Sequence, residues 1–296
     1  MVPLVDAHHH VWRQADLAWL QGPAQPRIFG EYAAIRRDYP IEEYLGEARA
    51  TGVVRSVYVQ TNWPPGREVE EVAWVQSVAD RHGFPHAIVG HADLGAPTVG
   101  VTLDDMMRHP RLRGIRQQLH WHEEALYRFA TRPDLTEDPA WRRGLEEVAR
   151  RGLVFELQVF APQMEGAARL VRDFPHLTFV LLHAGMLENR TPEGWTRWRA
   201  GMRALAAAPN VRVKLSGLGT FVRACSTALW GPVIRETVER FGPERCMFGS
   251  NFPIEKLWTT YADVVRVTVE CLGHLSAGQQ RAVLHDTADR VYRLSS

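Results

Sequence analysis

Short apolar runs alternate with longer amphipathic segments along the chain. Eight runs rich in Val, Ile, Leu and Phe have the length of strands: 3–9, 53–60, 86–93, 112–119, 153–160, 177–184, 211–218 and 245–252. Apolar residues at helical spacing fill segments between them: 67–83, 138–152, 161–175, 231–243 and 276–294. Alternating strands and helices form parallel sheets, and eight such units close into a barrel. The pattern predicts an α/β fold, one (β/α)8 TIM barrel over residues 1–296.

One segment departs from this alternation. Residues 13–44 are weakly periodic and contain two aromatic-rich patches. We expect them to form a loop over the barrel mouth, because the functional loops of such barrels lie at the C-terminal ends of the strands. The alternative is an N-terminal decoration without a role.

Alternation of side chains along a strand predicts which polar residues face the barrel interior. Asp6, His8 and His10 share one face of the first strand candidate, and His9 faces the other way. The later strand candidates contribute further inward or terminal polar residues: Arg116, Gln118, His120, Glu156, Gln158, His183, Lys214, Ser216 and Asn251. Polar side chains are costly to bury without partners, so their convergence at one end of the barrel predicts a functional site.

Composition and charge exclude several kinds of partner. The 35 basic and 34 acidic residues give a net charge of +1 without a basic block, so nucleic acid and anionic membranes are not expected partners. No run approaches the ~18 apolar residues of a membrane-spanning helix, and the N-terminus lacks the regions of a signal peptide. We therefore expect a cytoplasmic protein that acts on a small molecule. Self-association into a homo-oligomer stays open.

Seven motifs occur in order along the chain: DAHHHVW (6–12), RGIRQ (113–117), FELQV (155–159), LLHAG (181–185), VKLSGL (213–218), MFGSNFP (247–253) and TADRVYRL (287–294). Together they resemble the amidohydrolase superfamily, and most closely the amidohydrolase-2 family with its sugar-lactone and 2-pyrone-4,6-dicarboxylate lactone hydrolases. The resemblance implies a (β/α)8 barrel whose first strand ends in an HxH pair, here His8 and His10. It also implies hydrolysis of a lactone or a similar small cyclic ester.

Two positions depart from the metal-dependent proteins that the chain resembles. Gln158 stands where a fifth-strand histidine is expected, and Asn251 stands where most relatives carry an aspartate. A zinc-type cation takes at least three protein ligands, and the candidates here are His8, His10 and His183. Neutral amides are poor donors to such ions. We therefore expect no cofactor to be required, with zinc or manganese at the three histidines as the alternative.

The expected catalytic residues divide the tasks of lactone hydrolysis between them. Four would polarise the carbonyl, face the oxyanion or bind a substrate carboxylate: His8, His10, Arg116 and Lys214. His183 is the expected base and Glu156 the second candidate, whereas Asn251 can orient a water but cannot accept its proton. A metal-bound hydroxide is the other route to an activated water.

Five residues are expected to bind the substrate: Trp12, Trp63, Gln118, Trp121 and Gln158. The indoles offer apolar faces on which a ring can pack. Two other functions stay open, a metal-dependent decarboxylase of an unsaturated or aromatic acid and an inactive barrel that binds a ligand. The neutral amides at 158 and 251 count against the first, and the retained histidines and inward cations count against the second.

Overall fold

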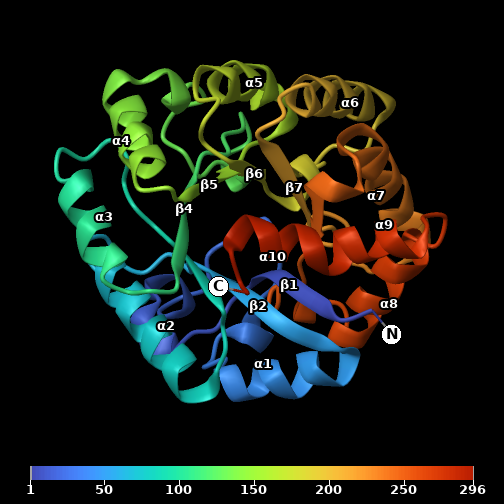
Figure 1. Cartoon of the computed structure of the whole chain (residues 1–296), viewed down its shortest axis with the longest axis horizontal. Helices are drawn as coiled ribbons and strands as arrows, with labels where there is room; N and C mark the ends of the chain where they lie inside the picture. The colour runs from blue at the N-terminus through green and yellow to red at the C-terminus, as the bar shows by residue number, and fades with distance from the viewer. Residues whose placement is uncertain (1, 296) are drawn as a thin grey trace.

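The computed structural model describes residues 2–295 and contains eight parallel strands in one sheet, ordered β1 to β8 (Figure 1). They are β1 (Leu4–His9), β2 (Val53–Val59), β3 (Ala87–Gly90), β4 (Leu112–Gln118), β5 (Val154–Gln158), β6 (Phe179–Leu181), β7 (Val211–Leu215) and β8 (Cys246–Phe248). A parallel bridge between His9 and Phe252 joins the ends of β1 and β8. The predicted barrel is confirmed, and each strand lies within its expected range.

Helices surround the barrel and connect successive strands (Figure 1). They are α1 (Ile41–Ala48), α2 (Glu68–His82), α3 (Val99–Met107), α4 (Pro139–Arg150), α5 (Met164–Asp173), α6 (Pro192–Ala206), α7 (Thr227–Phe241) and α8 (Tyr261–Cys271). Local sequence sets their ends, as at α4, where Asp138 accepts from two backbone N–H groups and Pro139 occupies the first position.

The C-terminal segment is helical from Ala277 to Tyr292, as expected over 276–294, but its middle is π-helical. A π-helical turn at Ala282–Asp286 separates α9 (Ala277–Arg281) from α10 (Thr287–Tyr292). Helix α10 crosses the barrel end that faces the viewer in Figure 1, and Tyr292 packs in the same apolar cluster as Val5 and Met247 of the strands. This end of the barrel is therefore closed by the chain itself.

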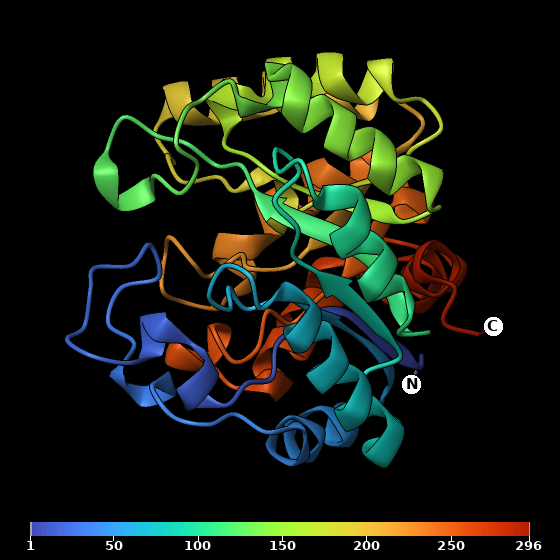
Figure 2. The same cartoon turned by 90° about the vertical axis from the view of Figure 1, so that its left-hand side faces the viewer.

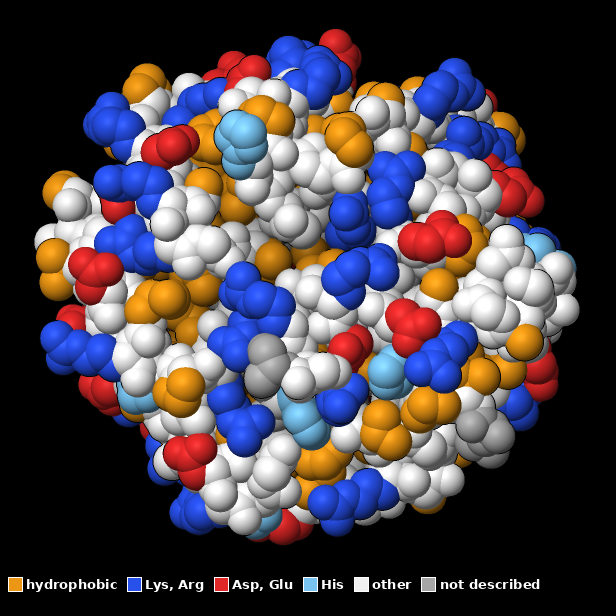
Figure 3. All heavy atoms as spheres, in the orientation of Figure 1, with side chains coloured by type: hydrophobic (Ala, Val, Ile, Leu, Met, Phe, Trp, Pro, Cys, Tyr) orange, Lys and Arg blue, Asp and Glu red, His pale blue; other side chains and the backbone are white. Residues whose placement is uncertain are grey.

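The opposite end of the barrel carries two long connections. Residues 13–40 and 119–138 project on the side away from the chain termini in Figure 2. On the face that bears α10, basic and acidic side chains are interspersed (Figure 3). Within residues 2–295, no helix has the length and apolar character needed to cross a membrane.

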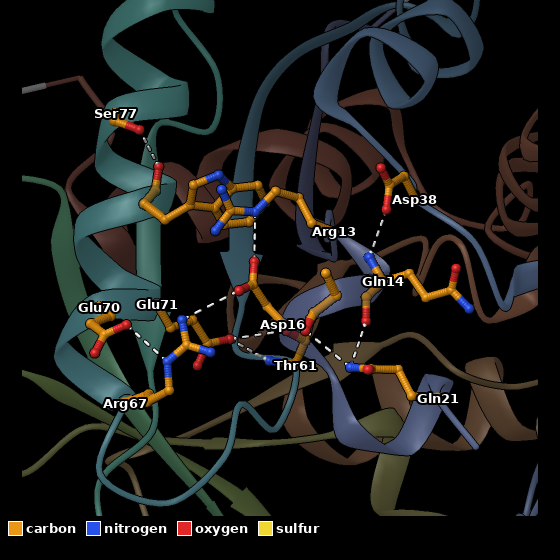
Figure 4. A network of polar contacts seen from close by, with 12 residues as sticks. Arg13, Gln14, Asp16, Gln21, Asp38, Thr61, Arg67, Glu70, Glu71 and Ser77 are labelled. Carbon is orange, nitrogen blue, oxygen red and sulfur yellow. Dashed lines mark hydrogen bonds and ion pairs between the residues drawn. The ribbon is translucent and has the colours of Figure 1, made fainter.

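The segment expected as a loop over residues 13–44 contains three short 3-10 turns, and α1 begins inside its predicted range. Backbone hydrogen bonds between Trp12 and Tyr39 fasten its two ends together. Asp16 accepts from Arg13 at 2.5 Å and from Arg67 at 3.3 Å, which ties the segment to the start of α2 (Figure 4). Nearby, the carboxylate of Glu71 accepts from the backbone N–H of Thr61 at 2.6 Å.

Candidate active site

A cavity of about 530 Å³ lies at the C-terminal ends of the strands. Eight of the residues selected from the sequence line it: His10, Trp12, Arg116, Gln118, His120, Gln158, His183 and Asn251. Because parallel strands place their C-terminal ends at one edge, residues far apart in sequence meet here. The structure thus brings most of the expected site residues around one cavity.

The first strand does not follow simple alternation. Its pairing with β2 shifts register after Asp6, and the carboxylate of Asp6 points out of the barrel, where it accepts from the hydroxyls of Tyr44 and Tyr261 at 3.0 and 2.8 Å. The expectation that Asp6 shares a face with His8 and His10 is therefore wrong. The register shift inserts an extra residue into β1 after Asp6. His8 and His10 therefore point into the barrel, although Asp6 points out of it.

Three imidazoles gather at the inner end of the cavity. The ring centroid of His8 lies 5.1 Å from that of His10 and 4.8 Å from that of His183. His8 is fully buried, does not line the cavity, and has no hydrogen-bond partner for either ring nitrogen among the described residues. Burial and the positive charge of Lys214 hold the pKa of His8 well below its usual range. The ring is therefore neutral near pH 7.

The hydrogen bond of His10 determines its tautomer. Nδ1 lies 2.7 Å from the carbonyl oxygen of Val59, which can only accept, so Nδ1 carries the proton. Burial lowers the pKa of His10 to about 3, so the neutral ring leaves Nε2 as an acceptor. His10 therefore cannot donate to a substrate carbonyl through Nε2, contrary to the role expected from the sequence.

His183 follows β6 with a left-handed backbone conformation, φ +53°. Its Nδ1 lies 2.9 Å from the hydroxyl of Ser216, and a Cβ at Gly217 would approach Nδ1 to 2.4 Å. Glycine at 217 is thus required for the observed ring position. Burial, followed by the charges of Arg116 and Lys214, holds the pKa of His183 well below its usual range. The neutral ring can accept a proton.

Arg116 supplies the fixed positive charge of the inner cavity. Its Nη2 donates to the carbonyl oxygen of Gln60 at 2.6 Å, and its Nη1 to Oε1 of Gln158 at 3.5 Å. Its Nε has no hydrogen-bond partner among the described residues. Burial lowers the pKa of Arg116 to about 10, so the side chain is still a cation at neutral pH.

Lys214 points into the barrel as expected but does not line the cavity. Its Nζ lies 2.5 Å from Oε1 of Glu156, which also accepts from the hydroxyl of Tyr292 at 2.6 Å. Lys214 and Glu156 are both fully buried. The catalytic role expected for Lys214, and the role of second-choice base for Glu156, do not fit this placement. Strand alternation predicts which way a side chain points. The depth of Lys214 and Glu156 in the barrel depends on Tyr292, which enters from the closed end.

Two of the expected tryptophans lie outside the cavity. Trp63 packs against Trp74, with the guanidinium of Arg67 4.7 Å from its ring centroid. Trp121 lies under Arg128 and lines a second depression. Neither lines the cavity around which the other expected site residues gather. Both follow a strand end, but their rings pack against Trp74 and Arg128 instead.

The sequence analysis missed several lining residues on the mouth loops. Arg27 and Arg128 contribute two more cations, whereas His120, which shares a face with Arg116 and Gln118, was already among the expected polar residues. Nε of Arg27 is buried without a hydrogen-bond partner among the described residues. The cavity is lined by three arginines and by no aspartate or glutamate of residues 2–295. The only sequence signal for Arg27 was the expectation that residues 13–44 form a loop over the barrel mouth.

A buried carboxyl lies directly behind Asn251 and was also missed. Glu255 is 1% exposed, and its oxygens accept from the backbone N–H of Gly219 at 3.3 Å and from Nε1 of Trp258 at 2.6 Å. The side chain of Asn251 is close to both Glu255 and His10 and is a minor influence on the pKa of each. Burial raises the pKa of Glu255 to about 8. The available signal was its position four residues after Asn251, just beyond the predicted strand.

The donors present do not fit a resident divalent cation. No group of three or more His, Cys, Asp or Glu side chains in residues 2–295 is arranged to hold one. Nδ1 of His10 and Nδ1 of His183 have protein partners, which leaves only Nε2 of each ring as a ligand atom, and no carboxylate lines the cavity beside the imidazoles. Arg116 adds positive charge where a bound cation would need negative charge. No step below is derived through a metal.

Comparison with known proteins places the chain among hydrolases. A family model described as amidohydrolase matches residues 5–294. The chain is 37% identical to y4mH of Sinorhizobium fredii, described as uncharacterised, over 99% of each chain. It is 30% identical to the L-fucono-1,5-lactonase of Burkholderia multivorans, over 98% of this chain and 96% of that protein.

A solved structure has the same arrangement of elements. It is an amidohydrolase from Burkholderia multivorans crystallised with bound zinc, 28% identical, with a TM-score of 0.83 over 98% of this chain and 99% of that one. The zinc belongs to that protein. In the present chain, the side chains available to hold a metal are those described above.

Proposed function

Because the chain belongs to the amidohydrolase family and is a hydrolase, we propose that it opens a small lactone that carries a carboxylate group. The observation that supports this proposal best is the positive charge of the cavity. Its lining contains Arg27, Arg116 and Arg128 and no acidic side chain of the described residues. Guanidinium groups suit carboxylates because their N–H groups match the two oxygens. The lactonase names of two relatives, 30% and 28% identical to this chain, support the reaction class.

The three arginines lie at two depths, which suggests two tasks. Arg27 and Arg128 come from the mouth loops and bind the substrate carboxylate. Arg116 is 4% exposed and lies at the inner end, where a fixed cation stabilises the oxyanion that develops on the lactone carbonyl. Residues 13–40 form part of the cover of this cavity, with Trp19 and Phe29 in its wall. Gln118 and Gln158 provide neutral hydrogen-bonding groups beside them.

His183 is the proton acceptor in this proposal. It takes a proton from a water that Asn251 orients, and the water oxygen adds to the lactone carbonyl carbon. The ring C–O bond of the tetrahedral intermediate then breaks, and His183 returns its proton to the leaving alkoxide. The product is a hydroxy acid, so one lactone and one water are consumed.

The low pKa of His183 is compatible with this role once the substrate is bound. Burial is the largest cause of the lowering, and the charge of Arg116 is the next. A substrate carboxylate brings negative charge near the arginines and offsets part of that second cause. An anionic lactone thus raises the basicity of His183, whereas a neutral lactone leaves it unchanged.

The proposal is tested by a pH-indicator screen of lactones with and without a carboxylate, run before and after treatment with a chelator. We expect acid release from carboxylate-bearing lactones, unchanged by the chelator. A metal-dependent decarboxylase, the alternative from the sequence, would instead release carbon dioxide from an unsaturated or aromatic acid and lose activity on chelation. An inactive barrel would bind such lactones without turnover.

A further inference from the structure

Glu71 is a fully buried carboxyl of helix α2 that the proposed mechanism does not use. Its Oε1 accepts from the backbone N–H of Thr61 at 2.6 Å, a contact that Figure 4 shows. The same oxygen accepts from the hydroxyl of Tyr58 at 2.7 Å. Thr61 follows β2 and lines the cavity, although Glu71 does not. The carboxyl therefore reaches the candidate active site through the backbone.

One peptide unit joins Glu71 to Arg116. The bond between Gln60 and Thr61 is trans, so its N–H and its C=O point in opposite directions from one rigid plane. The N–H end donates to Glu71, and the carbonyl oxygen of Gln60 at the other end accepts from Nη2 of Arg116 at 2.6 Å. The carboxylate and the guanidinium thus hold the same peptide plane from its two sides.

The carbonyl oxygen of Gln60 makes the shortest hydrogen bond to Arg116 among the described residues. Nη1 of Arg116 lies 3.5 Å from Oε1 of Gln158, at the limit of a hydrogen bond, and Nε has no partner among the described residues. The direction of the guanidinium therefore depends mainly on this carbonyl. The carbonyl in turn can keep its direction only while the N–H of the same peptide is held.

We infer that Glu71 is a positioning residue for Arg116: it holds the peptide between Gln60 and Thr61 so that the carbonyl of Gln60 fixes the guanidinium at the inner end of the cavity. The inference rests on the proposed function, in which Arg116 stabilises the oxyanion. A carboxylate at the N–H end also makes the carbonyl oxygen a stronger acceptor, because linked hydrogen bonds polarise one another. Glu71 acts on the site without touching the substrate.

The first test compares kcat for lactone hydrolysis in three variants. Glu71→Met has no acceptor for the N–H of Thr61, and we expect kcat to fall by about tenfold or more because Arg116 is misplaced. Glu71→Gln keeps an oxygen at this position and should lose less. Tyr58→Phe is the matched control, since it removes the hydroxyl donor to the same oxygen but leaves the contact with Thr61, and its kcat should stay near that of the wild type. Equal losses in all three would show that the carboxyl merely packs, which overturns the inference.

A double-mutant cycle separates Arg116 from the other group that this turn holds. The carbonyl oxygen of Thr61 accepts from Nε1 of Trp19 at 2.9 Å, so the turn also supports the cavity wall. If Glu71 acts through Arg116, Glu71→Met should change kcat little once Arg116→Gln is present, because coupled residues give non-additive losses. Additive losses would assign the effect to Trp19 or to packing and would overturn the inference.

A further readout needs no substrate. Nitrogen-15 NMR of the guanidinium of Arg116 resolves Nη1 from Nη2 only while rotation about the Nε–Cζ bond is slow, and Arg116→Gln identifies the signals by their loss. We expect separate signals in the wild type and in Tyr58→Phe, and merged signals in Glu71→Met. Glu71→Gln should rotate at an intermediate rate, which keeps the comparison available if Glu71→Met does not fold.

The substrate-free readout distinguishes failure of this inference from failure of the proposed function. Separate Arg116 signals and a wild-type rotation rate in both Glu71 variants would overturn the inference. If no lactone is hydrolysed but the signals merge as expected, the positioning of Arg116 by Glu71 holds and the proposed function fails.

Discussion

Nζ of Lys214 lies 2.5 Å from Oε1 of Glu156 inside the closed half of the barrel. Both side chains are fully buried, and Tyr292 donates to the same carboxylate oxygen from the C-terminal helix. This pair lies outside the cavity lining, whereas Arg116 lies within it. The barrel interior is therefore divided into a part that holds the C-terminal helix in place and a part that carries the proposed chemistry.

Removing one member of this pair should damage stability. Lys214→Met leaves Glu156 buried without its counter-ion, and we expect the free energy of unfolding to fall by about 3–5 kcal/mol. Lys214→Met combined with Glu156→Gln should cost less than the single change, since no charge is left unpaired. Urea unfolding measures both. A Lys214→Met protein that is as stable as the wild type but inactive would return Lys214 to the catalytic residues.

His183→Ala should lower kcat by about two to four orders of magnitude, the usual effect of losing a general base. Ser216→Ala removes only the partner of Nδ1, so we expect a smaller loss of kcat from a ring that is less well oriented. Steady-state kinetics with circular dichroism as a folding control distinguishes the two. Equal activity of His183→Ala and the wild type would show that another group activates the water.

Arg27 should contribute to recognition of the substrate carboxylate and not to the chemical step. Its Nε is buried without a hydrogen-bond partner among the described residues, and its guanidinium carbon lies 5.7 Å from the ring centroid of Trp19. We expect Arg27→Gln to raise KM for a carboxylate-bearing lactone by about tenfold or more, with Arg27→Lys intermediate. A neutral lactone serves as the internal comparison, and an equal rise in its KM would contradict this role.

Stability should depend on pH through Glu255. Burial raises the pKa of this carboxyl from 4.5 to about 8, so between these values the folded state keeps a proton that the unfolded state has lost. Stability therefore falls as pH rises across this window, by about 1.4 kcal/mol per pH unit for one such proton. Glu255→Gln should remove this fall.

The window from pH 6.5 to 8 isolates Glu255 from the buried histidines. Their folded pKa values are lowered, as at His10, so their contribution to stability rises with pH only up to about 6.5. Urea unfolding of both proteins at several pH values in this window measures the difference. Parallel stability curves for the wild type and Glu255→Gln would contradict the shifted pKa.

Hydrophobic patterning was sufficient to predict the barrel, because each buried strand must be a short apolar run and each connection an amphipathic one. The same alternation correctly placed Arg116, Gln118 and Gln158 on one inner surface. It failed at Asp6, because the register shift of β1 depends on pairing with β2 and is not visible in a single strand.

Other errors have tertiary causes. Lys214 faces inward as predicted, but its partner Glu156 comes from another strand and is fixed by Tyr292 at the far end of the chain. Glu255 was missed because its burial against Gly219 and Trp258 arises only in the folded chain. Periodicity indicates which way a side chain points, whereas its depth and partners depend on elements distant in sequence.

The central claim is that the arginine-lined cavity hydrolyses an anionic lactone without a resident metal. The most direct test is kcat/KM of the metal-stripped protein for two lactones of the same ring size, one with a carboxylate and one without. The account predicts that the carboxylate-bearing lactone is preferred by about tenfold or more, and that added zinc or manganese does not raise its rate. A stripped protein that is inactive until metal returns, or an equal preference for the neutral lactone, would contradict it.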